Sequence, residues 1–429
     1  MYFPSPLERV RERLNMKKTI LIIVAIVTVF SLHAEKIKIQ TGIEVLKAEN
    51  FKSLAGKRVG LITNPTGVDN NLKSTIDILF EAPNVKLVAL YAPEHGVRGD
   101  VYAGDKVTDT IDVKTGIPVY SLYSRKANKY SEVLKNIDVL VYDIQDIGSR
   151  SYTYISTMGK AMQASAEAGV EFMVLDRPNP LGGNRVEGNL AEDGFISGVS
   201  QFKIPYLYGL TCGELALMLN AEPQLGNTKA CKLQVVKMKG WKRKMFYSET
   251  GLQNQWVPTS PHIPEASSAF YYQSSGIVGE FSYMSIGVGY TVPFKLFATP
   301  WINAVELTNK LNNLKLPGVI FRPIYLQPFY GAYKGQNIQG VQFHITDFEK
   351  VPLTEIQFYV VQEVVALYPE HKLFTDEFRN RFNMFDKVCG SDKIRELFEK
   401  NYRWEDAKAY WDKDVDAWKK LSKKYWLYK

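Results

Sequence analysis

Short apolar runs alternate with amphipathic stretches through the first half of the chain. The apolar runs have the length of buried strands, whereas the amphipathic stretches have helical spacing. Strands are predicted at 57–63, 85–90, 118–122, 137–142, 171–175 and 233–238, and helices at 72–80, 130–134, 156–168 and 215–219. Thr211 and Glu214 resemble a capping box before the last of these helices. Strands that alternate with helices predict right-handed βαβ units and a Rossmann-like parallel sheet, which is an α/β fold.

This alternation ends in a proline-rich crossing. Pro258, Pro261 and Pro264 cannot continue a helix or a central strand. A stretch rich in Gly, Ser and Tyr follows. The pattern then predicts helices at 301–314 and 353–367, strands at 319–326 and 341–346, and two amphipathic helices within about the last forty residues. Because 429 residues exceed the usual size of one core, we expect a Rossmann-like domain at 40–255 and a smaller α+β domain at 256–429.

Residues 1–34 have the layout of a targeting segment. Met16–Lys18 is basic, Thr19–Phe30 is apolar and uncharged, and Ala34 offers a small residue at a cleavage point. This layout predicts a secretory signal peptide with Met1–Asn15 as an upstream leader. The apolar stretch is short for a transmembrane helix, so we expect no stable membrane span after cleavage; an uncleaved anchor is the alternative. The protein is therefore expected to be exported, either periplasmic or secreted.

The composition is that of an ordinary globular protein and says little about which molecules it binds. Hydrophobic residues at 45% and charged residues at 23% are ordinary for a globular protein. The net charge of +8 is mild and dispersed, which favours an anionic substrate over nucleic acid. Cys212, Cys231 and Cys389 lack metal-ligand spacing, and their odd number excludes a framework of disulfides, although one disulfide stays open.

The turn after the first predicted strand lacks the chemistry of a nucleotide site. It reads Thr63-Asn64-Pro65-Thr66-Gly67-Val68-Asp69, without the G-x-G-x-x-G pattern, and the chain has no Walker A motif. No His-x-x-His pattern is present either. We therefore expect neither a cofactor nor a metal site.

Charged groups gather where three predicted strands end. The segments are Tyr91–Asp100, Tyr142–Arg150 and Asp176–Pro180. Ligands of open α/β sheets bind outside the carboxyl ends of the strands, so three such ends predict one functional cleft. A solvated loop is the alternative for any one of them.

Glu94 is the best candidate for a catalytic acid. It follows an apolar strand, and partial burial would raise its pKa as a general acid requires. Asp143 and Asp146 supply further carboxylates, and paired carboxylates in a cleft are typical of glycoside hydrolysis. The alternatives are a structural ion pair of Glu94 with Arg98 or Arg150, and a metal site.

At these residues the chain resembles the exo-β-N-acetylmuramidase (NamZ) family, long described as a domain of unknown function. The matching blocks are Pro93-Glu94-His95-Gly96, Asp143 to Arg150 with Tyr152-Thr153-Tyr154, Asp176-Arg177-Pro178-Asn179-Pro180, Gly209-Leu210-Thr211 with Gly213 to Ala216, and Pro258 to Pro261 with Pro264. Tyr208 stands where the family block leads us to expect His. The resemblance runs from about Thr41 to near the C-terminus.

The resemblance implies an active site in the cleft between two domains, with Glu94 as the catalytic residue. It also implies release of N-acetylmuramic acid from non-reducing ends of peptidoglycan-derived oligosaccharides or muropeptides. The second catalytic group, the stereochemical course and the oligomeric state stay open.

That substrate carries a lactyl carboxylate, which a cation would recognise. Arg98, Arg150 and Arg177 are the candidates, with local ion pairs as the alternative. His95 is expected either to orient Glu94 or to contact substrate. The substrate-binding residues expected are Asn64, His95, Arg98, Arg150, Tyr152, Tyr154, Asp176, Arg177, Asn179 and His262. A non-catalytic periplasmic sugar-binding protein and a metal-dependent hydrolase are the competing readings of the same cleft.

Overall fold

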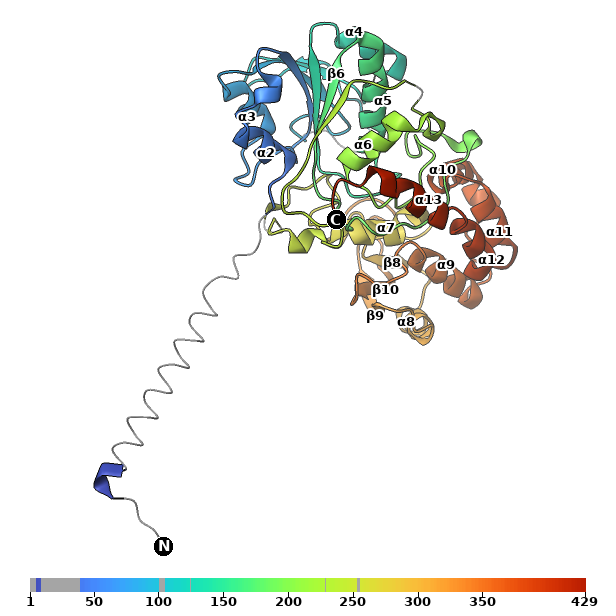
Figure 1. Ribbon diagram of the computed structural model, residues 1–429. Helices are drawn as coiled ribbons and strands as arrows, with labels where there is room; N and C mark the ends of the chain where they lie inside the picture. Colours follow the sequence, from blue (N-terminus) through green and yellow to red (C-terminus); the bar gives the residue numbers. More distant parts are fainter. Residues whose placement is uncertain (1–4, 9–38, 100–104, 124, 228, 253–254) are drawn as a thin grey trace.

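The computed structural model describes residues 5–8, 39–99, 105–123, 125–227, 229–252 and 255–429 (Figure 1). Apart from residues 5–8, the predicted leader and signal peptide lie outside these ranges. Within the described ranges, no helix combines the length and the apolar character needed to cross a membrane.

Seven strands form the sheet of the first domain. They are β1 (Arg58–Thr63), β2 (Lys86–Ala92), β3 (Thr110–Ile111), β4 (Pro118–Ser121), β5 (Val139–Asp143), β6 (Glu171–Leu175) and β7 (Leu233–Val236). Their order is β3-β4-β2-β1-β5-β6-β7, with β3 antiparallel at the edge and the other neighbours parallel. Without β3, this is the strand order of a Rossmann fold, so the predicted α/β class is confirmed.

Helices cover both faces of this sheet. They are α2 (Gly42–Ala48), α3 (Thr75–Glu81), α4 (Tyr130–Val133), α5 (Thr153–Ala168) and α6 (Cys212–Ala221). Helices α2 and α3 pack on one face of the sheet and form one hydrophobic core with it. Helices α5 and α6 pack on the other face and form a second core. The predicted capping box of Thr211 and Glu214 begins α6, and Gly169 ends α5 with a φ of 68° that suits glycine.

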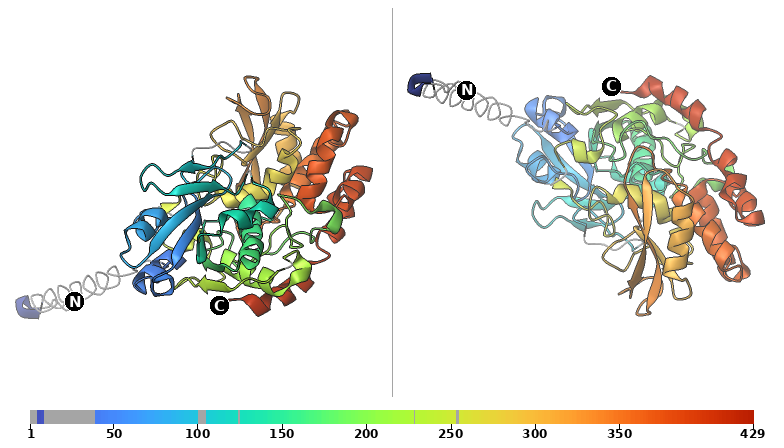
Figure 2. Two further views of the ribbon diagram at one scale, coloured as in Figure 1. Left: turned by 90° about the horizontal axis from the view of Figure 1, so that it is seen from above. Right: turned by 90° about the horizontal axis from the view of Figure 1, so that it is seen from below.

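The second domain contains a small antiparallel sheet, drawn in orange in Figure 2, with helices packed beside it. Its strands are β8 (Leu296–Thr299), β9 (Val319–Leu326) and β10 (Ile338–Ile345), in the order β8-β10-β9. Its helices are α7 (Ser268–Gly279), α8 (Ala304–Asn313), α9 (Ile356–Leu367), α10 (Arg379–Cys389), α11 (Lys393–Asn401) and α12 (Trp404–Trp411), and α13 (Val415–Ser422) follows. The expectation of two helices near the chain end was wrong, because Tyr402 adopts a φ of 52° and separates α11 from α12.

Helix α7 forms from the stretch rich in Gly, Ser and Tyr, for which the sequence pattern gave no element. The helix is largely buried, and Phe270 and Ile277 pack into the core of the second domain. The hydroxyls of Ser274 and Ser275 donate to backbone carbonyls one turn earlier, so they need no outside partner. Tertiary burial therefore outweighs weak helix propensity here.

The end of the chain returns to the first domain, where α13 lies beside α6 in Figure 1. Trp418 packs into the core that α5 and α6 share, and its Nε1 donates to the carbonyl of Tyr208 at 2.8 Å. Beyond α13, the Tyr428 hydroxyl donates to Asp176 Oδ2 at 2.6 Å and accepts from the amide of Met238 at 3.0 Å. Residues 415–428 therefore complete the core of the first domain.

Candidate active site

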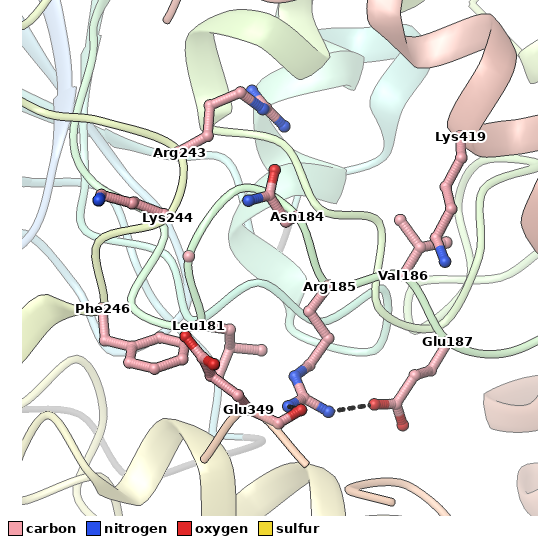
Figure 3. A pocket seen from close by; sticks show the side chains of 11 residues that line it. Leu181, Asn184, Arg185, Val186, Glu187, Arg243, Lys244, Phe246, Glu349 and Lys419 are labelled. Carbon is pink, nitrogen blue, oxygen red and sulfur yellow. Dashed lines mark hydrogen bonds and ion pairs between the residues drawn. The ribbon is translucent and has the colours of Figure 1, made fainter. Parts of the chain in front are cut away.

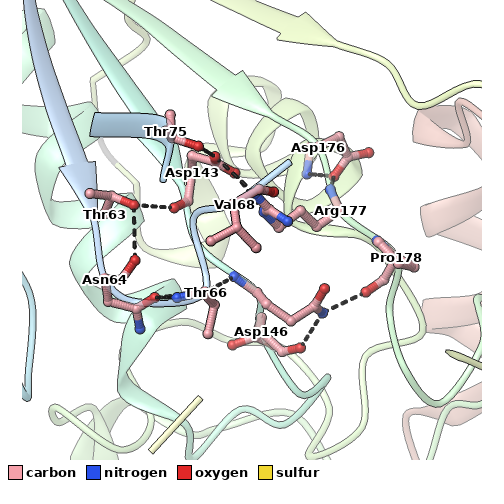
Figure 4. A network of polar contacts seen from close by, with 12 residues as sticks. Thr63, Asn64, Thr66, Val68, Thr75, Asp143, Asp146, Asp176, Arg177 and Pro178 are labelled. Atoms are coloured by element: carbon pink, nitrogen blue, oxygen red, sulfur yellow. Dashed lines mark hydrogen bonds and ion pairs between the residues drawn. The ribbon is translucent and has the colours of Figure 1, made fainter. Parts of the chain in front are cut away.

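Four of the expected site residues lie at the carboxyl edge of the large sheet. Asn64 follows β1, Glu94 follows β2, Asp143 ends β5 and Asp176 follows β6. The strand order reverses between β1 and β5, and Figure 4 shows their ends together with that of β6. Ligands of doubly wound sheets bind at such a reversal.

Glu94 is half-buried and held by hydroxyl groups. Thr153, in the first turn of α5, donates its Oγ1 proton to Glu94 Oε2 at 2.6 Å. The Tyr123 hydroxyl also bonds to Glu94; burial, the nearby carboxylate and this bond raise the pKa of Tyr123 to about 12. Sequence reasoning missed both residues, although Thr153 stands inside the Tyr152-Thr153-Tyr154 block. Two hydroxyl donors thus fix the orientation of the carboxyl group.

His95 is buried and has a left-handed backbone. Its φ is 71°, and Gly96 follows with a φ of 78°. Such a conformation costs a non-glycine residue on the order of 1–3 kcal/mol. Eight other non-glycine residues of the described ranges share it, so the backbone fixes the direction of the His95 side chain without by itself marking a functional site.

His262 brings the second domain to the same place. Burial lowers its pKa, and the nearby His95 contributes to the shift. His262 Nε2 lies 2.8 Å from the hydroxyl of Tyr330, in the segment that follows β9. Tyr330 carried no sequence signal. These contacts place Glu94, His95 and His262 at the border between the two domains.

Tyr152 and Tyr154 connect α5 to the proline-rich crossing. Their rings meet edge to face with centroids 5.0 Å apart. The Tyr152 hydroxyl lies 2.7 Å from Thr259 Oγ1, and the Tyr154 hydroxyl donates to the Thr259 carbonyl at 2.5 Å. Tyr154 is buried, whereas Tyr152 is partly exposed. Both tyrosines position the crossing against the site, and Tyr152 is the more accessible of the two.

Asp143 and Arg177 form a buried ion pair (Figure 4). Arg177 donates to both carboxylate oxygens, from Nε at 2.6 Å and from a terminal nitrogen at 2.9 Å. Thr75 Oγ1 donates to the same carboxylate at 2.6 Å. The alternative of a local ion pair therefore describes Arg177, and Asp143 is enclosed by its donors.

Arg150 and Arg98 are also engaged within the protein. Arg150 is fully buried and donates to the carbonyls of Asn189, Ile204 and Val388 at 2.6–3.0 Å. Burial lowers its pKa to about 10. Arg98 makes a two-pronged pair with Asp112, at 2.9 and 3.0 Å. The structure thus supports a structural role for Arg150 and gives its guanidinium no route to a substrate.

Asp146 faces away from solvent toward Tyr208. The Tyr208 hydroxyl donates to Asp146 Oδ2 at 2.5 Å, and the amide of Gly148 donates to the same oxygen at 2.7 Å. Burial raises the pKa of Asp146 to about 6. Tyr208, at the position where His was expected, is therefore a buried partner of this carboxyl group.

Asp176, Asn179 and Asn64 organise loops. Asp176 is fully buried and accepts from Thr211 Oγ1, the Gly213 amide and Tyr428 at 2.6–2.8 Å. Asn179 caps its own turn by accepting from the amide of Leu181 at 3.0 Å and donating to the carbonyl of Leu210 at 3.0 Å. Asn64 does the same in the turn after β1, where its Oδ1 accepts from the Thr66 amide at 3.0 Å.

Substituting Asp176 by Asn is expected to change the pH dependence of stability. Burial raises the pKa of Asp176 from 3.8 to about 7. The folded chain keeps a proton that the unfolded chain releases, so this group stabilises the fold below about pH 4, and the contribution is lost as pH rises through 7. Relative to wild type, the unfolding free energy of the variant should rise by about 2–3 kcal/mol from pH 5 to 8 in urea titrations. If the unfolding free energies of wild type and variant depend on pH in the same way, Asp176 is ionised in the folded protein.

The described residues contain no group of three or more His, Cys, Asp or Glu side chains that could hold a metal ion. Cys212, Cys231 and Cys389 are buried and free, so the disulfide that the sequence left open does not form among them. The elements of a metal-dependent hydrolase are thus not gathered in the described ranges.

Two hollows lie near the loops that follow the strands. One, of about 510 Å³, borders the Glu94 loop and is lined by Gly96, Val97 and Arg98 together with residues between Lys106 and Val119. The other, of about 380 Å³, lies where Arg185 reaches the second domain through the carbonyl of Val351 (Figure 3). Arg98 lines the first hollow, whereas none of the expected site residues lines the second. A much smaller cavity, of about 10 Å³, is lined by Asp146, Arg177 and Asn179.

Comparison with known proteins gives matches along nearly the whole chain. Family models described as the N-terminal and C-terminal parts of exo-β-N-acetylmuramidase NamZ match residues 59–267 and 270–428. The peptidoglycan β-N-acetylmuramidase NamZ of Bacillus subtilis (strain 168) is 45% identical over 395 residues, which is 92% of each chain.

Two crystal structures of DUF1343 family proteins from Bacteroides fragilis NCTC 9343 are also similar. One has a TM-score of 0.87 at 65% identity and covers 92% of this chain and 100% of that chain. The other has a TM-score of 0.69 at 30% identity, with 91% and 99% covered. By sequence along nearly its whole length and by fold, the chain belongs to the NamZ family of exo-β-N-acetylmuramidases.

Proposed function

We propose that this protein is an exo-acting glycoside hydrolase that removes N-acetylmuramic acid from the non-reducing ends of peptidoglycan fragments. The observation that carries the proposal is the placement of Glu94. This carboxyl group stands at the carboxyl end of β2, is oriented by the hydroxyls of Thr153 and Tyr123, and lies where both domains meet. A carboxyl group held in this way can deliver a proton to a leaving oxygen.

Only the acid step is assigned. Glu94 protonates the glycosidic oxygen as the bond to the anomeric carbon breaks, and water completes the hydrolysis. Asp143 and Asp146 are buried against Arg177 and Tyr208, so they hold the scaffold around Glu94. Retaining and inverting enzymes differ in the distance between their two catalytic carboxylates. Neither Asp143 nor Asp146 is available as the partner of Glu94, so this distance cannot be measured among these three groups.

The lactyl carboxylate of the substrate needs a donor or a cation. Arg150 and Arg177 are committed to buried partners, and Arg98 is paired with Asp112, so we assign this task to His95 and His262. Each imidazole has two ring nitrogens, and both become donors when the ring is protonated. A bound carboxylate would oppose the lowering of the His262 pKa and favour the charged form of that ring.

An aryl β-N-acetylmuramide should be hydrolysed about a hundredfold faster, as kcat/KM, than the matching N-acetylglucosaminide. A site built to pair a carboxylate loses those contacts when the lactyl group is missing. The two rates are measured side by side with a chromogenic leaving group. Equal rates would contradict the proposal, whereas binding without turnover of either compound would favour the non-catalytic sugar-binding protein.

We also propose export through the segment before residue 35. Expression of the full chain with its natural start, followed by fractionation and N-terminal sequencing, tests this. A mature protein that begins near Glu35 outside the cytoplasm supports export, and an intact chain in the cytoplasm contradicts it.

A further inference from the structure

Large aromatic side chains are exposed next to the candidate active site. Phe329 is 70% exposed and Tyr330 is 49% exposed, and they are adjacent in the segment between β9 and β10. Most large apolar side chains of the described residues are buried, and exposed apolar groups that adjoin one another offer a surface for a ligand. We call these two residues the aromatic rim.

The backbone of the aromatic rim is fixed. The amide of Phe329 donates to the carbonyl of Gly289 at 2.8 Å, and the Phe329 ring stacks on Tyr290 with centroids 6.0 Å apart. Gly289 has a φ of 91°, and a Cβ there would lie 1.9 Å from the carbonyl oxygen of Tyr330. Farther along, the Tyr333 hydroxyl donates to the carbonyl of Tyr283 at 2.8 Å. A platform held in place before binding loses little conformational entropy when a ligand arrives.

The aromatic rim is continuous with the residues around Glu94. The Tyr330 hydroxyl lies 2.8 Å from His262 Nε2, and the two rings are tilted with centroids 5.9 Å apart. His262 in turn lies near His95, the neighbour of Glu94 in the chain. A row of contacts thus leads from the half-buried carboxyl group outward to exposed rings of the second domain.

We propose that the aromatic rim binds the sugar on the leaving-group side of the scissile bond. This inference rests on the proposed exo-hydrolysis. An exo-acting site encloses the terminal sugar and leaves the other side of the bond open to the rest of the glycan. The exposed rings lie at the outer end of the row of contacts, and the C–H face of a pyranose packs well on an aromatic ring.

Binding measurements in a Glu94→Gln chain test the inference without requiring turnover. The ligands are N-acetylmuramic acid and the β-linked disaccharide of N-acetylmuramic acid with N-acetylglucosamine, each titrated by calorimetry. Phe329→Ala in that background should raise the Kd of the disaccharide about tenfold and change the Kd of the monosaccharide less than twofold. Phe329→Trp should restore the disaccharide affinity.

Tyr325 provides a matched control. It is 63% exposed, but it lies within β9 opposite Gln339, outside the aromatic rim. Tyr325→Ala should leave both dissociation constants unchanged. Equal weakening of both ligands by Phe329→Ala, or no weakening of either, would overturn the inference. Failure of wild type to hydrolyse the disaccharide would instead count against the proposed function, because the binding comparison is independent of it.

Discussion

Replacing Glu94 with Gln is expected to lower kcat on the disaccharide about a thousandfold. Glutamine keeps the shape of the side chain and its contact with Thr153, but it has no proton to deliver. The aryl group of an activated aryl muramide leaves as a stable phenolate that needs little protonation, so this substrate should lose far less rate. The wild-type profile of rate against pH should have an alkaline limb, and this limb should move or vanish in the variant. Steady-state kinetics on the two substrates measure both effects.

Glu265→Gln is the control for this substitution. Glu265 is exposed, pairs with Lys295 and lies three residues after His262 in the chain. Its removal should leave both rates within twofold of wild type. If Glu94→Gln slows both substrates equally, Glu94 is not the acid, and a role as nucleophile, base or structural residue takes its place.

Arg150→Met is expected to lower the free energy of unfolding by about 3–5 kcal/mol. The substitution leaves the buried carbonyls of Asn189, Ile204 and Val388 without their donor, and each unpaired group costs about 1–3 kcal/mol. Val388 belongs to α10, so the guanidinium also ties the two domains together. Guanidinium chloride titration measures the loss.

Arg98→Met is the matched comparison, because its pair with Asp112 is more exposed, with 39% of the Arg98 side chain accessible. Arg98→Met should cost less than Arg150→Met, because the buried Asp112 carboxylate keeps its two donors on Thr115. If Arg150→Met keeps full stability and only raises KM for muramides, Arg150 binds substrate after all. The comparison of the two substitutions therefore distinguishes a structural role of Arg150 from the anion-binding role that the sequence predicted for it.

The strand ends were predictable because burial and alternation leave a strong pattern. The predicted strand at 171–175 coincides with β6, and that at 57–63 differs from β1 by one residue. From these ends, the gathering of Asn64, Glu94 and Asp143 at one sheet edge follows by the rule for parallel sheets. Helix α7 was not predicted, because several of its buried positions are Gly or Ser and so do not form an apolar helical pattern.

Partnerships across the chain were not predictable in the same way. Arg177 pairs with Asp143, which ends another strand, and Asp176 pairs with Tyr428, which is 252 residues away. A sequence shows that a carboxylate and an arginine share a sheet edge, but their side-chain directions depend on the final packing. His262 lies in the irregular proline-rich crossing and Tyr330 in a loop. Neither segment has a periodic hydrophobic pattern, so their contact could not be predicted from the sequence.

The buried bond of Tyr428 to Asp176 has a consequence for biosynthesis. The carboxyl end of β6 leaves the ribosome long before the residue that seals it, and the whole second domain emerges in between. Trp418 likewise reaches the core beside α6 only after α12 has been made. The native contacts of Tyr428 and Trp418 with the first domain can therefore form only after the intervening second domain has been synthesised.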